Sequence, residues 1–157
     1  LVLIIYFCNQ IEDMIQRKQS LWLLLSSLCC GFELYPSFIM VKTITPGIGM
    51  LEDNIIQATE NPIIMYGSFL SAGLAFSAIF LFKNRGLQIL IASLAAMIQL
   101  FACIGFVFYT LYSNGKFPEM RAEIGLYLGI FGVISVWLAT RGIRRDEEIV
   151  QSQDRLR

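Results

Sequence analysis

Histidine is absent from the sequence, which removes the commonest general base and metal ligand at neutral pH. The four cysteines lie in apolar surroundings, and no two of them have the spacing Cys-x-x-Cys. This pattern predicts neither a zinc site nor a disulfide framework. A net charge is also absent, because 12 basic residues balance 12 acidic ones. We therefore expect no metal, no cofactor and no nucleic-acid partner.

Two long runs contain no Asp, Glu, Lys or Arg: Ile63 to Phe82, with 20 residues, and Leu87 to Tyr112, with 26. Each run is long enough to cross a bilayer, which needs about 20 apolar residues. Only residues 83–86 separate the runs, so we expect two antiparallel helices joined by a tight basic turn at a membrane surface. A hydrophobic content of 56% and a mean hydropathy of +0.64 agree with a membrane protein.

One further span is expected on each side of this hairpin. The first begins at about Ser20 and reaches about Met40, although Pro36 should end or kink its helix. The fold class predicted is all-α, an integral membrane four-helix bundle in up-down order. The predicted spans are residues 20–40, 63–82, 87–112 and 124–140.

The remaining segments are predicted to lie outside these spans. Residues 1–13 form an N-terminal extension whose apolar run is too short to span, and Met14 opens a short basic leader. Between the first two spans, Met50 to Thr59 is expected to form a short surface helix. We divide the chain into the extension 1–13, the membrane domain 14–143 and a charged tail 144–157.

The distribution of basic residues predicts the orientation. The side that holds both termini and the basic turn carries nine Lys and Arg residues, whereas the other side carries three. Because cytoplasmic loops are enriched in Lys and Arg, both termini are expected in the cytoplasm. The expected location is the bacterial inner membrane.

Small residues recur at the spacing of helix-packing faces. The second span has Gly67, Ser71 and Ala75, and the fourth has Gly125, Gly129 and Gly132. Such faces let helix backbones approach closely inside a membrane. Two interpretations stay open: packing within the chain's own bundle, or docking of a partner subunit.

Glu33 is the one acid inside a predicted span, and burying its charge in a membrane is costly. Because the helix should break before Pro36, Glu33 falls in the last turn, from which it can reach the outer interface. Two roles for Glu33 stay open: a structural role at the interface or in helix packing, or the coupling of protons or cations to transport. Gln99 lies in mid-span and is expected to form a structural hydrogen bond with another helix. Cys29 and Cys30 are expected to be buried apolar residues.

The fourth helix ends in a dense cluster of mixed charge. Its residues are Arg144, Arg145, Asp146, Glu147 and Glu148. Arg144 and Glu148 are four residues apart, which favours continuation of the helix into water. The cluster is either a solvated helix end or a cytoplasmic docking site.

Three stretches together resemble a family of small four-helix membrane proteins from Bacteroidota, catalogued as a domain of unknown function, number 4293. They are residues 14–17 ahead of a Leu-rich helix, residues 81–88, and residues 141–150 with 154–157. The resemblance covers Met14 to Arg157. It implies an inner-membrane location and no mechanism.

The function expected is a non-enzymatic accessory or scaffold subunit of a membrane complex. Its partners would be the lipid bilayer and a membrane protein or further copies of the chain. The alternative is a small proton-coupled exporter that works as an oligomer and uses Glu33. It is similar to the small multidrug-resistance transporters, although those place their acid deeper in the membrane. A disulfide-generating oxidoreductase would need outward-facing cysteine pairs, which the sequence lacks.

Overall fold

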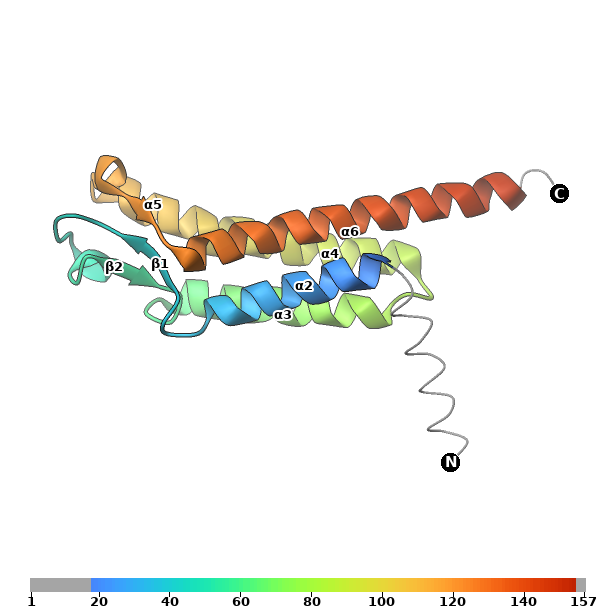
Figure 1. Ribbon diagram of the computed structural model, residues 1–157, viewed down its shortest axis with the longest axis horizontal. Coiled ribbons are helices and arrows are strands. Elements are labelled where there is room, and N and C mark those ends of the chain that lie inside the picture. The colour runs from blue at the N-terminus through green and yellow to red at the C-terminus, as the bar shows by residue number, and fades with distance from the viewer. Residues whose placement is uncertain (1–17, 155–157) are drawn as a thin grey trace, which may run out of the picture.

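The computed structural model describes residues 18–154, with side chains described over 19–146. Four helical rods run up and down beside one another (Figure 1). Their bounds are α2 (Lys18–Glu33), α3 (Pro62–Phe80), α4 (Arg85–Ile98) and α6 (Ile124–Asp154). The third rod continues from α4 through the π-helix η2 (Gln99–Gly105) into α5 (Phe106–Ser113). The predicted up-down order is thus found in the structure.

Three stretches are long and apolar enough to cross a membrane, as expected of an integral membrane protein. They are Pro62–Phe80, Arg85–Ser113 and Ile124–Asp146. Helix α3 begins where the sequence indicates, because the Asn61 side chain accepts a hydrogen bond of 2.8 Å from the Ile63 N–H and Pro62 opens the helix. Helix α6 continues past Thr140, as the tail pattern predicted.

The prediction that the first span reaches Met40 is wrong. Helix α2 ends at Glu33 after 16 residues, and residues 39–42 form a strand instead. The break before Pro36 was expected, because proline disfavours helical backbone at the residue before it. At about 1.5 Å per residue the described part of α2, from Lys18 on, is roughly 24 Å long.

A small antiparallel sheet requires a correction of the all-α fold class. Strand β1 (Ile39–Lys42) lies between β2 (Ile55–Gln57) and β3 (Arg121–Ala122). The sheet joins the α2–α3 connection to the α5–α6 connection at one end of the bundle, which we call the sheet end (Figure 1). The opposite end, called the basic end, carries Lys83, Arg85, Arg141, Arg144 and Arg145.

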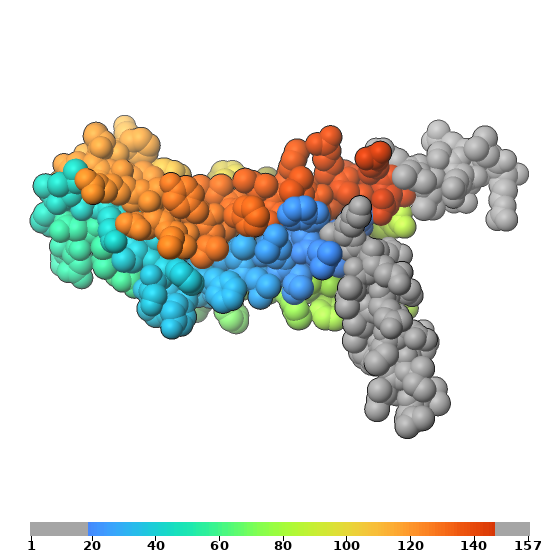
Figure 2. Space-filling view, viewed as in Figure 1, coloured from blue at the N-terminus to red at the C-terminus, as the bar shows by residue number. Residues whose placement is uncertain are grey.

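The predicted surface helix over Met50–Thr59 is also wrong. This segment forms a single 3₁₀ turn, η1 (Gly49–Leu51), and then strand β2. Asn54, at φ 61°, turns the chain into the strand, and the adjacent isoleucines favour extended backbone. A second 3₁₀ turn, η3 (Phe117–Glu119), precedes β3. The two connections form one surface at the sheet end in Figure 2.

The core has two apolar clusters along the bundle. The cluster at the sheet end places Met40, Val41 and Ile56 of the sheet against α3, η2, α5 and the start of α6. The cluster at the basic end joins Leu23 of α2 to small and β-branched residues of α3, α4 and α6. A group of polar side chains lies between these two clusters.

Candidate functional site

Glu33 lies inside the bundle, so the prediction that it can reach the outer interface is wrong. It is the last residue of α2, yet its side chain is only 1% exposed. The carboxylate points among α3, η2 and α6 and away from the surface. Its nearest contacts are about five to seven residues inside α3 and α6, roughly 8 to 10 Å from their ends. A carboxylate at this place must find its partners within the chain.

Gln99 provides the shortest contact to this carboxylate. Its Nε2 donates a hydrogen bond of 2.5 Å to Glu33 Oε2, and the side chain is 1% exposed. The expected hydrogen bond between Gln99 and another helix is therefore present. Gln99 is the first residue of the π-helix η2, a wide turn that is frequent at functional sites. The sequence pattern did not reveal this turn.

Two serines of α3 extend the polar group toward the cysteines. Ser68 Oγ donates to Glu33 Oε2 at 3.4 Å and lies 3.2 Å from Cys103 Sγ. Ser71 Oγ donates to the Ala95 carbonyl at 2.9 Å and also approaches Cys30 Sγ at 3.7 Å. The predicted burial of Cys29 and Cys30 is confirmed, with exposed fractions of 6% and 1%. We call Glu33, Ser68, Ser71, Gln99, Cys30 and Cys103 the polar cluster.

The glycines of the small-residue faces make room for this cluster. A Cβ on Gly129 would lie 3.0 Å from both Gln99 Nε2 and Glu33 Oε1, and one on Gly132 would lie 2.9 Å from Cys30 Sγ. A Cβ on Gly67 would lie 3.0 Å from Cys103 Sγ. Gly125 instead lets α6 approach the chain at the start of strand β1, since a Cβ there would lie 2.7 Å from the Phe38 carbonyl oxygen.

These faces are therefore filled by the chain itself. Ala75 is fully buried and Ser71 is 2% exposed, so the α3 stripe points into the bundle as well. Of the two interpretations left open by the sequence, packing within the bundle describes the geometry of this structure. A partner that docks on the chain would have to use another surface.

Four buried polar side-chain atoms lack a hydrogen-bond partner among the described residues: Glu33 Oε1, Gln99 Oε1, Ser26 Oγ and, in the α2–α3 connection, Asn54 Oδ1. A buried acceptor without a donor costs about 1–3 kcal/mol. The first two belong to the strongest pair of the cluster, so its hydrogen bonding is incomplete. No group of three His, Cys, Asp or Glu side chains that could hold a metal occurs within the part of the chain that the structure describes.

The charged cluster at the end of α6 is only partly described. Arg144 and Arg145 are exposed, and Asp146 accepts a hydrogen bond from the Gln19 side chain of α2. Gly142 lies against Gln19 too, since a Cβ there would be 3.0 Å from Gln19 Cγ. The side chains of Glu147 and Glu148 lie outside the described residues. The tail is thus anchored to α2 one turn beyond Gly142.

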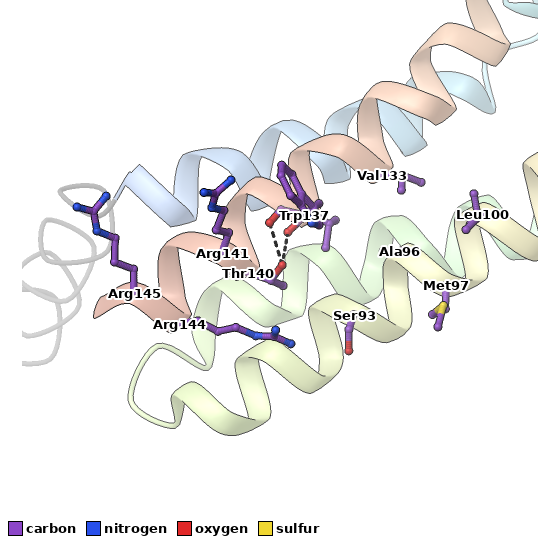
Figure 3. Close-up of a pocket in the computed structure, with 11 residues that line it drawn as sticks. Ser93, Ala96, Met97, Leu100, Val133, Trp137, Thr140, Arg141, Arg144 and Arg145 are labelled. Carbon is purple, nitrogen blue, oxygen red and sulfur yellow. Dashed lines mark hydrogen bonds between the residues drawn. The ribbon is translucent and has the colours of Figure 1, made fainter. Parts of the chain in front are cut away.

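A groove between α4 and α6 was not predicted from the sequence. It has a volume of about 710 Å³ and opens at the side of the bundle (Figure 3). Its apolar lining includes Ala96, Met97, Leu100, Val133 and Trp137, and Arg141, Arg144 and Arg145 line its basic end. The groove residues on α6 recur every three or four positions, so they lie on one face of the helix. This spacing alone does not predict a groove, because the groove also needs the facing side of α4.

The comparisons with known proteins bear on the whole chain. The family model described as domain of unknown function, DUF4293, matches residues 15–156. The chain therefore belongs to the DUF4293 family, and the resemblance stated from the sequence is confirmed. The comparison with curated proteins and the comparison with solved structures gave no match.

Proposed function

We propose that this DUF4293 protein is a non-enzymatic accessory or scaffold subunit of a complex in the bacterial inner membrane. Both termini would lie in the cytoplasm, and the partner would dock on the end of α6. The single observation that carries this proposal is the length of α6. Its 31 residues span about 46 Å, roughly 16 Å more than the hydrocarbon core of a bilayer.

The position of the excess length supports a docking role. Helix α6 starts at the sheet and passes beyond the other rods at the basic end (Figure 1). The charged cluster lies where the projection begins: Arg144, Arg145 and Asp146 are still on the bundle, and the Gln19–Asp146 contact ties the start of the projection to α2. Since the small-residue faces are filled inside the bundle, we take the end of α6 as the candidate docking surface.

The proposed orientation is supported by the charges at the two ends. At the sheet end, Lys42 pairs with Glu123 at 3.1 Å and Lys116 with Glu119 at 3.7 Å. The described cations of the basic end make no ion pair in the part of the chain that the structure covers. An end that is richer in Lys and Arg is typical of the cytoplasmic side of an inner-membrane protein.

Purification of the tagged full chain from its native membrane in a mild detergent tests the proposal. The informative variant ends at Asp146, which removes the projection but keeps the bundle and all three arginines of the groove. We expect a stoichiometric partner in the wild type and its loss in this variant. A variant that lacks only residues 155–157 is the control. A partner retained after truncation at Asp146, or a chain that purifies alone, would contradict the proposal.

A second candidate function is a proton-coupled exporter that uses Glu33. The observation that favours it is the unpartnered Oε1 of a carboxylate buried among helices, since an intramembrane acid is a candidate for coupling. The closed packing around Gly129 disfavours it. If Glu33 couples protons to export, Glu33→Gln should abolish export of cationic compounds from cells. Unchanged resistance in that variant would exclude the exporter.

A further inference from the structure

The groove between α4 and α6 is lined by apolar side chains at one end and by arginines at the other. Val133 and Leu100 lie at its apolar end, and Arg144 and Arg145 lie at the basic end of the bundle. From Val133 to Arg145 the helix rises by 12 residues, or about 18 Å. This length is close to half the hydrocarbon thickness of a bilayer. The groove therefore matches one lipid leaflet, with acyl chains at one end and a headgroup at the other.

The hydrogen-bond donors that remain available in the described groove are its arginines and the indole N–H of Trp137. The hydroxyls of Thr140 and Ser93 already donate to backbone carbonyls of their own helices, at 2.9 Å and 2.8 Å to Trp137 and Leu90 respectively. Arg141 lies over the Trp137 ring, with 5.5 Å from its Cζ to the ring centroid. A headgroup at this end would thus meet positive charge and the indole N–H of Trp137, whereas both hydroxyls of the lining are already engaged.

Figure 3 shows how the arginines are placed. Arg144 reaches from α6 toward α4, on the side where Ser93 lies, and Arg141 lies beside Trp137. No acidic side chain lines the described groove. Asp146, the nearest acid along the described helix, accepts its hydrogen bond from Gln19. The positive charge of the groove is therefore not balanced by the lining residues.

We propose that this groove binds an anionic phospholipid, with the phosphate at the end of the groove that Arg141, Arg144 and Arg145 line and an acyl chain against Met97, Leu100 and Trp137. In a bilayer, an apolar groove open to the side is filled by lipid chains, and basic pockets between helices bind anionic headgroups. Arginine suits a phosphate because its guanidinium can donate two parallel hydrogen bonds. The site goes beyond the proposed docking role, because it lies on the bundle and does not need the projecting tail.

Trp137 offers a direct probe of the site, because it lines the groove and is 56% exposed. The chain has two tryptophans, so Trp22→Phe leaves Trp137 as the single fluorophore. The protein is reconstituted in phosphatidylcholine vesicles that contain increasing fractions of brominated phosphatidylglycerol, or of brominated phosphatidylcholine. Bromine quenches tryptophan on contact, so the two titrations give the relative affinity of the groove for the two lipids.

We expect Trp137 to prefer phosphatidylglycerol at least about five-fold, since one basic residue near a membrane surface contributes roughly that factor. In the triple variant Arg141→Gln, Arg144→Gln, Arg145→Gln, the affinity for phosphatidylglycerol relative to phosphatidylcholine should fall to about one. The matched control is Lys83→Gln, Arg85→Gln, which removes charge from the same end of the bundle but not from the groove. That control should keep the preference, and Trp22 in a Trp137→Phe protein should show none.

Three results would overturn the proposal. Equal quenching by the two lipids would show that the groove takes annular lipid without selection. A preference that survives loss of the three arginines would place the anionic lipid elsewhere. If neither lipid quenches Trp137, then protein and not lipid covers the groove. The unfolding curve of the triple variant should coincide with that of the control Lys83→Gln, Arg85→Gln. A changed lipid preference then reports a change in binding and not in folding.

Discussion

The polar cluster and the groove both place polar side chains between helices, yet they differ in what satisfies those side chains. In the cluster, Glu33 meets Gln99 and Ser68 from neighbouring rods, and Gly129 leaves no space for anything more. In the groove, the arginines meet no acid of the described chain, and the space beside them is open. The closed packing of the cluster is that of a structural contact between helices, whereas the open groove leaves room for the lipid proposed above.

The largest expected effect comes from filling the cluster. Gly129→Leu would force a side chain against Gln99 Nε2 and Glu33 Oε1, both 3.0 Å from the first added carbon. We expect a loss of about 3 kcal/mol or more in the free energy of unfolding, from overpacking and from separation of the buried pair.

Gly73→Leu is the matched control, because nothing lies within 4 Å of a Cβ at that position of α3. It should change stability by less than about 0.5 kcal/mol. Unfolding of both variants in the same detergent, followed by near-ultraviolet circular dichroism, gives the comparison. Equal losses in the two would mean that the cluster is not tightly packed.

A smaller effect is expected when one partner of the buried pair is removed. Gln99→Leu leaves Glu33 with the 3.4 Å contact to Ser68 as its remaining donor, which should cost about 2 kcal/mol. The double variant Glu33→Leu, Gln99→Leu removes both polar groups and should recover most of that loss, because two matched apolar groups leave nothing unsatisfied.

The same unfolding measurement on the two single variants and the double variant gives the coupling energy of the pair. Additive losses would show that Glu33 and Gln99 do not depend on each other. That result would weaken the structural role of the cluster and strengthen the exporter alternative.

The sequence predicted the rods far better than the contacts between them. The charge-free runs at 63–82 and 87–112 predict helices because only a helix satisfies its own backbone in lipid. The sheet was missed because Ile39, Met40 and Val41 continue the apolar run of the first helix, and only pairing with β2 and β3 makes them a strand.

The site was predicted in its parts and not in its arrangement. Glu33, Gln99 and Gly129 were each singled out, but they lie on three rods, and no spacing along the chain shows that they meet. The depth of Glu33 was wrong for the same reason, because the space that admits its carboxylate is provided by Gly129 of α6. The groove was missed because two helices far apart in the sequence share its lining. Val133 of α6, for example, is 37 positions after Ala96 and 40 positions after Ser93 of α4.

The most direct test of the account is the lipid preference of Trp137, measured side by side in Glu33→Gln and in the triple arginine variant. The account predicts that Glu33→Gln keeps the preference for phosphatidylglycerol, since the carboxylate lies in the closed cluster, and that the triple variant loses it. Loss of the preference in Glu33→Gln, together with its retention in the triple variant, would contradict the division of the molecule into a structural cluster and a ligand-binding groove.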